Sequence, residues 1–494
     1  MPSVMLDDGL LFVTQVGEPN RDPATRRLVK RFLMQQIGRN KRKKGLQRRQ
    51  SALQCILDAP LSLLMPNSAG SISAHSHMPL LSPQESNQEF NPQSYDDIRI
   101  TDRLGAGRYD PFVKFPIDMS SHARELIDTM FDIHSGSAPA LRESWFAIGI
   151  LDAASFNQLL AGAASYYRFL RTGNAEVESQ DSIAHHANSL SLVNDRIKHG
   201  HAITSDGTIG AIIGFACYYN RVGDFEKWLS HLAGLKEIVR LRGGIDSLNS
   251  NQHLRFLLNC IDLSGSYALD IAPNFPIAPA VLHQPSDSSY AIDSSRLQDL
   301  NNTWRSIAPT HTTLMDIIND ISIENAHLKA DIMQTRGRIW RDSMRVFHYI
   351  NPLLHRLLSL PPMDSATPSS FMAEGLCLAA ILYLASLRHT FGIYPNRVSN
   401  QLYKLRTLYE RWNDGSNQAR WDEVGLDWLN FWIVGFATIL SHHEANHEYF
   451  VEHFYIARSS MSTEPRVSFE VLAHGFLWIP DVHEPLLKAL ELVD

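Results

Sequence analysis

The sequence predicts an all-α protein, a multi-helix bundle or irregular helical array, preceded by a disordered N-terminal linker. Beyond about residue 100, apolar residues recur at intervals of three and four over most of the chain, which is the spacing of one helix face. Few segments alternate as strands do. With 44% hydrophobic residues in a chain of 494, there is enough apolar material for a large buried core.

Composition and charge narrow the class of protein. The sequence has no uninterrupted run of eighteen apolar residues, and Asp7 and Asp8 stand where a signal peptide would carry positive charge. We therefore expect an intracellular protein that does not associate with membranes. The net charge of −7 predicts neither nucleic-acid nor membrane binding for the molecule as a whole, so any such role requires a local patch.

One basic patch lies in the first 50 residues. Asp22-Pro23 is typical of a helix start, and residues 28–37 carry an apolar stripe that Gly38 ends. A dense basic cluster follows, whose charges could bind a nuclear import receptor or phosphate groups. Direct DNA contact and an inert, solvated arm are the alternatives. The basic cluster consists of Arg39, Lys41, Arg42, Lys43, Lys44, Arg48 and Arg49.

Residues 51–99 are expected to form a flexible linker. From Pro60 onward this stretch is rich in Ser, Pro, Asn, Gln and His and has no sustained apolar period. Such a composition buries too little apolar surface to offset the entropy lost on folding. The sequence thus divides into a targeting segment at 1–50, a linker at 51–99 and a helical domain at 100–494.

Twelve segments of the helical domain carry the helical period. The clearest is 225–241, which Gly243 and Gly244 can end by taking up the left-handed backbone. Pro- and Ser-rich breaks at 273–289 and 361–370 are expected to be loops within one helical body. The expected helices are 123–131, 145–151, 153–170, 183–197, 205–220, 225–241, 254–269, 335–360, 373–391, 398–412, 428–441 and 467–476.

The cysteines and paired histidines do not form a recognisable metal site. Cys55, Cys217, Cys260 and Cys377 lie singly, without the short spacing of a thiolate zinc site, and are expected to be core residues. His185-His186 lie on a predicted helix, where adjacent side chains point about 100° apart. We expect this pair to be hydrogen-bonded or exposed rather than to share a ligand.

One local motif indicates a different class of protein. His443-Glu444-Ala445-Asn446-His447 fits H-E-x-x-H, in which two imidazoles one helical turn apart bind zinc and the Glu activates water. A third ligand at His453 would require a bend that a glycine normally provides, and the matching position is Phe450. The motif is therefore predicted to be a solvated polar helix end, with His443 and His447 as weak metal candidates and no cofactor expected.

Short motifs spread over most of the chain carry a family resemblance. The blocks include Asp110-Pro111-Phe112, Leu241-Arg242-Gly243-Gly244, Glu374-Gly375-Leu376 and Phe476-Leu477-Trp478-Ile479. Together they resemble the fungal-specific transcription factor domain family. Phe12-Val13 with Arg27-Leu28-Val29-Lys30 is similar to the N-terminal motif of a subgroup without the zinc cluster, sometimes labelled tachykinin-family.

The resemblance implies an all-α fold and a role in transcriptional regulation, usually beside a six-cysteine binuclear zinc cluster that reads DNA. Four cysteines cannot supply six thiolates, so DNA binding by this chain is expected to be weak or indirect. The resulting hypothesis is a non-catalytic nuclear regulator whose partners are an import receptor and other transcription regulators. The alternatives are a helical scaffold unrelated to transcription and a zinc metallohydrolase using residues 443–447. Helical faces of this kind can be buried within one chain or in a homodimer.

Overall fold

In the computed structural model, the described residues from 114 onward are mainly helical. The basic cluster, the linker and Cys55 lie outside the residues that it describes. At the N-terminus, β1 (Val4–Asp7) and β2 (Leu10–Val13) pair antiparallel, with Val4 opposite Val13. These strands were not predicted, although Asp8-Gly9 between them is a typical hairpin pair. The described residues are 4–7, 10–13, 114–131, 139–172, 179–277, 295–342, 345–363, 367–393, 398–413, 421–442, 444–461 and 467–490.

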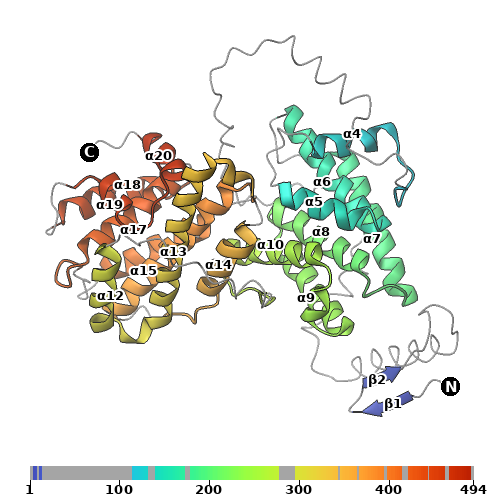
Figure 1. Ribbon diagram of the computed structural model, residues 1–494, viewed down its shortest axis with the longest axis horizontal. Coiled ribbons are helices and arrows are strands. Elements are labelled where there is room, and N and C mark those ends of the chain that lie inside the picture. The colour runs from blue at the N-terminus through green and yellow to red at the C-terminus, as the bar shows by residue number, and fades with distance from the viewer. Residues whose placement is uncertain are drawn as a thin grey trace, which may run out of the picture.

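The described residues from 114 onward form sixteen α-helices and no strand, which confirms the all-α prediction. Figure 1 shows two lobes, α4 to α9 on one side and α12 to α20 on the other, with α10 between them. The helices are α4 (Ser121–Met130), α5 (Pro139–Gly149), α6 (Ala153–Thr172), α7 (Gln180–His199), α8 (Asp206–Val222), α9 (Phe225–Arg242), α10 (Gln252–Leu269), α12 (Ser295–Ile307), α13 (Thr312–Thr335), α14 (Asn351–Leu358), α15 (Pro368–Thr390), α16 (Ser399–Asn413), α17 (Asp427–Leu440), α18 (His447–Ser459), α19 (Phe469–His474) and α20 (Pro480–Lys488).

Local sequence explains where the helices of the first lobe begin and end. The side chains of Ser205, Asp224 and Asn251 each accept a hydrogen bond from a free amide at the start of α8, α9 and α10. Gly223 and Gly243 adopt the left-handed backbone that ends α8 and α9. These signals are short-range, which is why the predicted bounds of α8, α9 and α10 lie within two residues of the observed ones.

The first lobe has its own hydrophobic core, formed mainly by α8, α9 and α10. Its largest buried side chains include Phe215, Trp228 and Phe256. Helix α10 is buried along almost its whole length, from Leu254 to Ala268. It can lie this close to α9 because residue 265 is a glycine, and a Cβ there would overlap the indole ring of Trp228.

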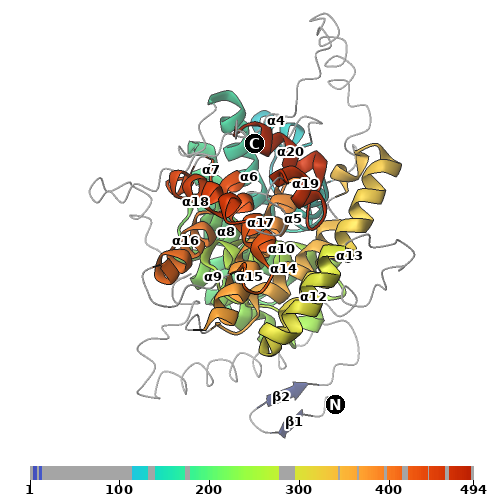
Figure 2. The same ribbon diagram turned by 90° about the vertical axis from the view of Figure 1, so that its left-hand side faces the viewer.

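The second lobe is built around α15, on which α13, α14, α16 and α17 pack. Its core contains the buried aromatic residues Phe371, Trp432 and Trp478. By length and hydropathy α15 could span a membrane, but 94% of the window that meets this test is buried inside the protein. Its apolar character is therefore explained by its place in the core. Figure 2 shows the second lobe in front of the first.

The predicted helix at 335–360 is wrong in its first part, whereas residues 346–358 are helical. Helix α13 ends at Thr335, and Arg336 and Gly337 follow with φ angles of 51° and 76°, a backbone conformation that breaks the helix. A 3₁₀ turn at Arg338–Arg341 and a π-helical turn at Val346–Ile350 then lead into α14. Helices α12, α13, α18 and α20 were not predicted, although Leu314, Ile318 and Ile321 of α13 already show the helical spacing.

Two buried histidines are expected to make the protein sensitive to acid. Burial lowers the pKa of both His231 and His483 to about 3, and a positive charge on Lys329 adds to the effect at His483. His483 Nδ1 accepts from the Ile479 amide, so protonating this nitrogen would place two donors face to face. Because the unfolded chain takes up these protons near pH 6.5, stability is retained above that pH and lost as the pH falls toward 3.

We expect the free energy of unfolding to fall by about 1.4 kcal/mol per pH unit for each histidine below pH 6.5. Chemical denaturation at pH 7 and pH 5 measures this loss. A His483→Gln variant keeps an acceptor for Ile479 but cannot ionise, so over this range it should lose about 1.4 kcal/mol per pH unit less than the wild type. An equal loss in both proteins would show that His483 does not contribute.

Candidate functional site

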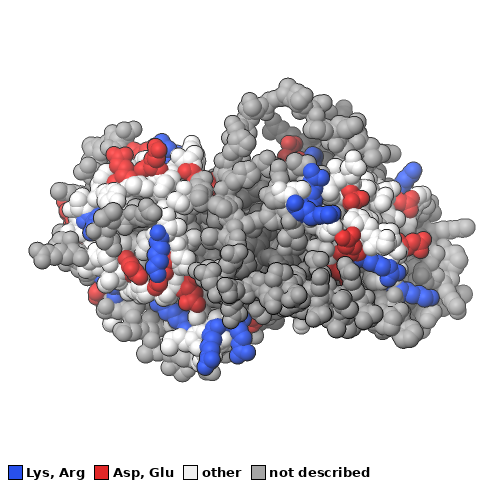
Figure 3. All heavy atoms as spheres, turned by 90° about the horizontal axis from the view of Figure 1, so that it is seen from above, with Lys and Arg blue, Asp and Glu red and all other residues white. Residues whose placement is uncertain are grey.

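The residues predicted to carry nuclear targeting are outside the described part of the chain. This applies to Arg39, Lys41, Arg42, Lys43, Lys44, Arg48 and Arg49, and also to His443. On the face shown in Figure 3, basic and acidic side chains of the described residues lie next to one another on both lobes. This face of the helical body therefore has no large patch of one charge among the described residues. Candidate sites have to be sought in individual clusters of side chains.

The H-E-x-x-H segment does not lie on one helix. Helix α17 ends at Leu440 and α18 begins at His447, so the described residues between them form turns. The segment thus lies where α17 ends and α18 begins, and His447 opens α18. Its Nδ1 lies 3.2 Å from the hydroxyl of Ser441, which fixes the ring against the end of α17.

His453, the residue that would have to be the third zinc ligand, contacts Tyr449 instead. The ring of His453 stacks on Tyr449 with centroids 3.9 Å apart, and its Nδ1 lies 2.9 Å from the Tyr449 carbonyl oxygen. Zinc hydrolases of this type need the first two histidines on one helical turn. Among the described residues of the segment, 444–446 form a bend and turns before α18 rather than a helical turn.

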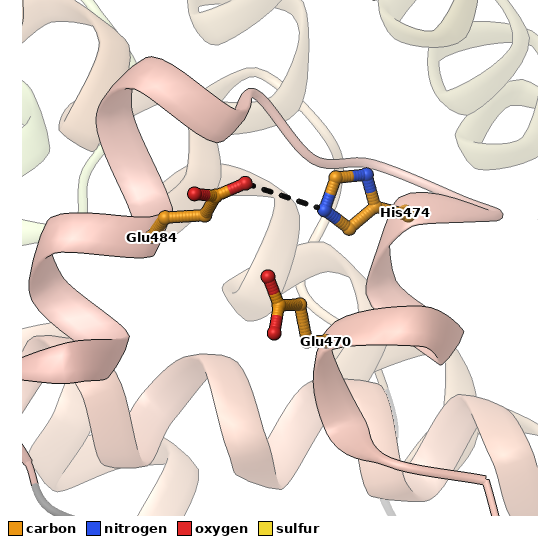
Figure 4. Close-up of side chains that lie close together, drawn as sticks. All are labelled: Glu470, His474 and Glu484. Atoms are coloured by element: carbon orange, nitrogen blue, oxygen red, sulfur yellow. Dashed lines mark ion pairs between the residues drawn. The ribbon is translucent and has the colours of Figure 1, made fainter.

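A different group of metal-ligating side chains comes together between α19 and α20. The ligand atoms of Glu470, His474 and Glu484 lie within 4.8 Å of one another. Figure 4 shows Glu470 and His474 projecting from α19 toward Glu484 of α20. The Glu-x-x-x-His spacing was visible in the sequence, because positions four apart share a helix face. The third member is 10 residues beyond His474 and was not predictable from spacing.

This α19–α20 cluster is best described as a solvated ion-pair network. His474 Nε2 lies 3.6 Å from Glu484 Oε1, and Lys488 Nζ lies 3.4 Å from the other oxygen of Glu484. The imidazole is 40% exposed. One imidazole and two carboxylates are a reasonable donor set for a divalent cation, but the lysine competes for one carboxylate and water reaches the site. The geometry assigns it no catalytic role.

The paired histidines of the sequence analysis and Arg242 of the Leu241-Arg242-Gly243-Gly244 motif have structural partners. His185 and His186 point to different residues of α6, with ring nitrogens 3.0 Å from the amide oxygens of Asn157 and Gln158. This confirms the expectation that the two histidines are hydrogen-bonded. Arg242 donates to the Thr204 carbonyl and to Asp206, so it ties the end of α9 to the start of α8.

The most buried ion network joins α13 to the π-helical turn. Arg345 donates to Glu324 at 2.9 Å and also pairs with Asp331. Burial raises the pKa of Glu324 to about 7, even though Arg345 acts in the opposite direction. The network fixes the irregular segment that replaces the first part of the predicted helix at 335–360.

Comparison with known proteins gives one match. Residues 111–419 fit the family model described as a fungal specific transcription factor domain, which is more than half of the chain. The matched region includes α4 to α16, and therefore the whole first lobe and the central helix α15 of the second. No curated protein and no solved structure matches the chain.

Proposed function

Because the chain belongs to the fungal-specific transcription factor domain family, we propose that it is a transcription regulator that acts in the nucleus through protein partners. The observation that carries this proposal is the match over residues 111–419, which extends across both lobes of the all-α body. The family is one of regulators rather than of enzymes, which supports a non-catalytic role. The alternative of a zinc hydrolase lacks the helical H-E-x-x-H arrangement described above.

The cysteines support a regulator without a zinc cluster in this sequence. There are four, against the six thiolates of a binuclear cluster. Burial raises the pKa of Cys260 and Cys377 to about 12, and it also raises that of Cys217, so these thiols stay protonated in the helical body. Since zinc binds the thiolate, they are unsuited as ligands. Sequence-specific DNA contact would then come from a partner, such as a zinc-cluster factor.

The organisation that fits this role has three parts. Residues 1–50 carry the basic cluster, 51–99 form a linker, and 100–494 form the helical body. Support for extending the body beyond residue 419 comes from α17, whose Trp432 and Phe436 are buried in the same core as α15. Helix α20 also contacts α15 and α17. The second-lobe part of the matched region and the helices after it thus share one hydrophobic core.

The localisation of a fluorescent fusion tests the proposal. We expect the wild-type fusion to be concentrated in the nucleus and a variant with Arg39, Lys41, Arg42, Lys43 and Lys44 changed to Ala to lose most of this enrichment. The reason is that import receptors recognise clustered positive charge. The matched control changes five exposed basic residues of the helical body to Ala and should stay nuclear. These are Lys198, Lys236, Arg305, Arg411 and Lys488.

Each result separates the candidate functions. Cytoplasmic signal from all three fusions would contradict the regulator and favour a helical scaffold unrelated to transcription. Nuclear signal that all three retain would leave nuclear action standing but remove the basic cluster as its cause. Where the wild type and control are nuclear and the variant is not, association of the wild type with chromatin is expected through other regulators.

A further inference from the structure

The junction between the two lobes contains an unusual polar surface. Helix α10 contributes to both cores, with Phe256 in the first and Leu263 and Tyr267 in the second. Cys260, Ser264 and Tyr267 follow one another at helical spacing, so they share one face of α10. This face meets α14, α15 and α16, which belong to the second lobe.

An arginine of α15 is buried against this face. Arg388 is only 4% exposed, and its Nη2 donates to the hydroxyl of Ser264 at 3.1 Å. Its Nε has no hydrogen-bond partner among the described residues. Cys260 and Tyr267 are the two groups near enough to stabilise the charged guanidinium, and they would do so only if they were ionised. Burial raises the pKa of both, so both are neutral at physiological pH.

A comparison within the molecule shows how unusual this is. Arg255 is buried to the same degree and its Nε also lacks a hydrogen-bond partner among the described residues, but it donates to the Pro276 carbonyl and is favoured by the carboxylates of Asp246 and Asp262. Arg345 pairs with two carboxylates. Arg388 has no carboxylate partner among the described residues, although a guanidinium does not deprotonate in proteins. A buried, uncompensated charge is costly, which implies a counter-ion that the described chain does not supply.

Neighbouring polar atoms also lack partners in the described part of the chain. The hydroxyl of Tyr267 has none, and neither do the amide oxygens of Asn351 and Gln401. The amide nitrogen of Asn351 lies 3.8 Å from Cys260 Sγ, and that of Gln401 donates to the Tyr267 carbonyl, which places both residues at the same face of α10. Nearly all buried polar atoms in proteins are hydrogen-bonded, so four orphans at one junction point to a bound molecule.

We propose that a small monocarboxylate binds between α10 and α15, with its anionic oxygens on the guanidinium of Arg388 and the hydroxyl of Tyr267. A carboxylate matches the planar fork of a guanidinium, and one buried arginine neutralises one negative charge. The amide oxygens of Asn351 and Gln401 are acceptors, so the ligand also carries a donor such as a hydroxyl or an amine. Because the site joins α10 to the second lobe, the bound molecule contacts both lobes. This inference goes beyond the proposed function and does not depend on nuclear localisation.

Thermal unfolding of the full chain with a defined probe tests the site. The probe is lactate, a monocarboxylate with a hydroxyl donor, and the reference is sodium chloride at the same ionic strength. We expect lactate to raise the unfolding midpoint by about 2 °C or more as the site saturates, because it binds the folded state alone. Acetate, which has no donor, should raise the midpoint less.

Variants locate the effect. Arg388→Met should abolish the rise of the unfolding midpoint with lactate. In chloride this variant should unfold at or above the wild-type temperature, because an apolar side chain of similar length replaces an unpaired buried charge and removes its desolvation penalty. Tyr267→Phe removes only the orphan hydroxyl and should weaken lactate binding several-fold. Ser264→Ala is the matched control, since it removes a polar neighbour of Arg388 but leaves the guanidinium in place, and it should keep the rise.

Three outcomes would overturn the proposal. No rise with lactate or acetate would indicate that water alone satisfies the junction. An equal rise in Arg388→Met would place the binding elsewhere on the protein. A midpoint several degrees lower for Arg388→Met in chloride would show that the arginine stabilises the fold by itself, without a ligand.

Discussion

Replacing Gly265 by alanine is expected to destabilise the protein by about 3 kcal/mol or more, although alanine favours a helix by about 1 kcal/mol over glycine. Gly265 lies in the fully buried stretch of α10, and an added Cβ would overlap Cε2 and Cζ2 of Trp228. Trp228 is itself completely buried in α9, so neither side can move away cheaply. The overlap therefore outweighs the gain in helix propensity. Denaturant unfolding followed by circular dichroism measures the loss.

A second glycine-to-alanine substitution provides the control. Gly162 lies within α6, and a Cβ there would meet nothing within 4 Å. Only the propensity term remains, so Gly162→Ala should stabilise the protein by roughly 0.5–1 kcal/mol. If Gly265→Ala behaved like Gly162→Ala, the close approach of α9 and α10 would not exist as described.

Replacing Arg345 by methionine is expected to cost about 3–5 kcal/mol at pH 8, because it leaves a buried carboxylate without its cation. The Arg345 side chain is 12% exposed and that of Glu324 is 8% exposed, so water screens the pair poorly. The substitution also releases Asp331, and with it the irregular segment between α13 and α14. Denaturant unfolding of the wild type and the variant gives the difference.

The loss caused by Arg345→Met should depend on pH. The pKa of Glu324 is raised to about 7, so the folded state holds this proton more tightly than the unfolded state does. Stability from this group is therefore highest at low pH and falls as the pH rises toward 7. Without Arg345 the charged carboxylate costs still more, so the variant should lose less at pH 6 than at pH 8. A double variant with Glu324→Gln should recover much of the loss, and failure to do so would show that the pair does not act as a unit.

The surroundings of Gly265 and of Arg345 were predictable from the sequence to different degrees. The helical period and the glycine pair at 243–244 predicted α9, and the period predicted α10, because both signals act over one or two turns. The contact of Gly265 with Trp228 joins positions 37 residues apart, and no local pattern marks it. The Arg345 network lies where the prediction failed, since a non-glycine residue with positive φ, Arg336, ends α13.

The candidate sites divide in the same way. The basic cluster from Arg39 to Arg49 was found from charge density alone and stays a prediction. Of the α19–α20 cluster, the pair Glu470 and His474 was visible as helical spacing, whereas Glu484 joins it only through the packing of α20. No sequence pattern predicted the site between α10 and α15. Arg388 and Ser264 are 124 residues apart, and nothing in either segment indicates a missing counter-ion.

By itself, the sequence determined the all-α class, most helix positions in the first lobe and the family resemblance that the match over 111–419 bears out. These follow from interactions between residues three or four apart and from capping groups next to each helix end. Tertiary structure alone decided where α13 stops, where α18 starts, and which buried polar groups meet between α10 and the second lobe. Those outcomes depend on which helix faces pack together, and that choice minimises exposed apolar area over the whole chain rather than within any one segment.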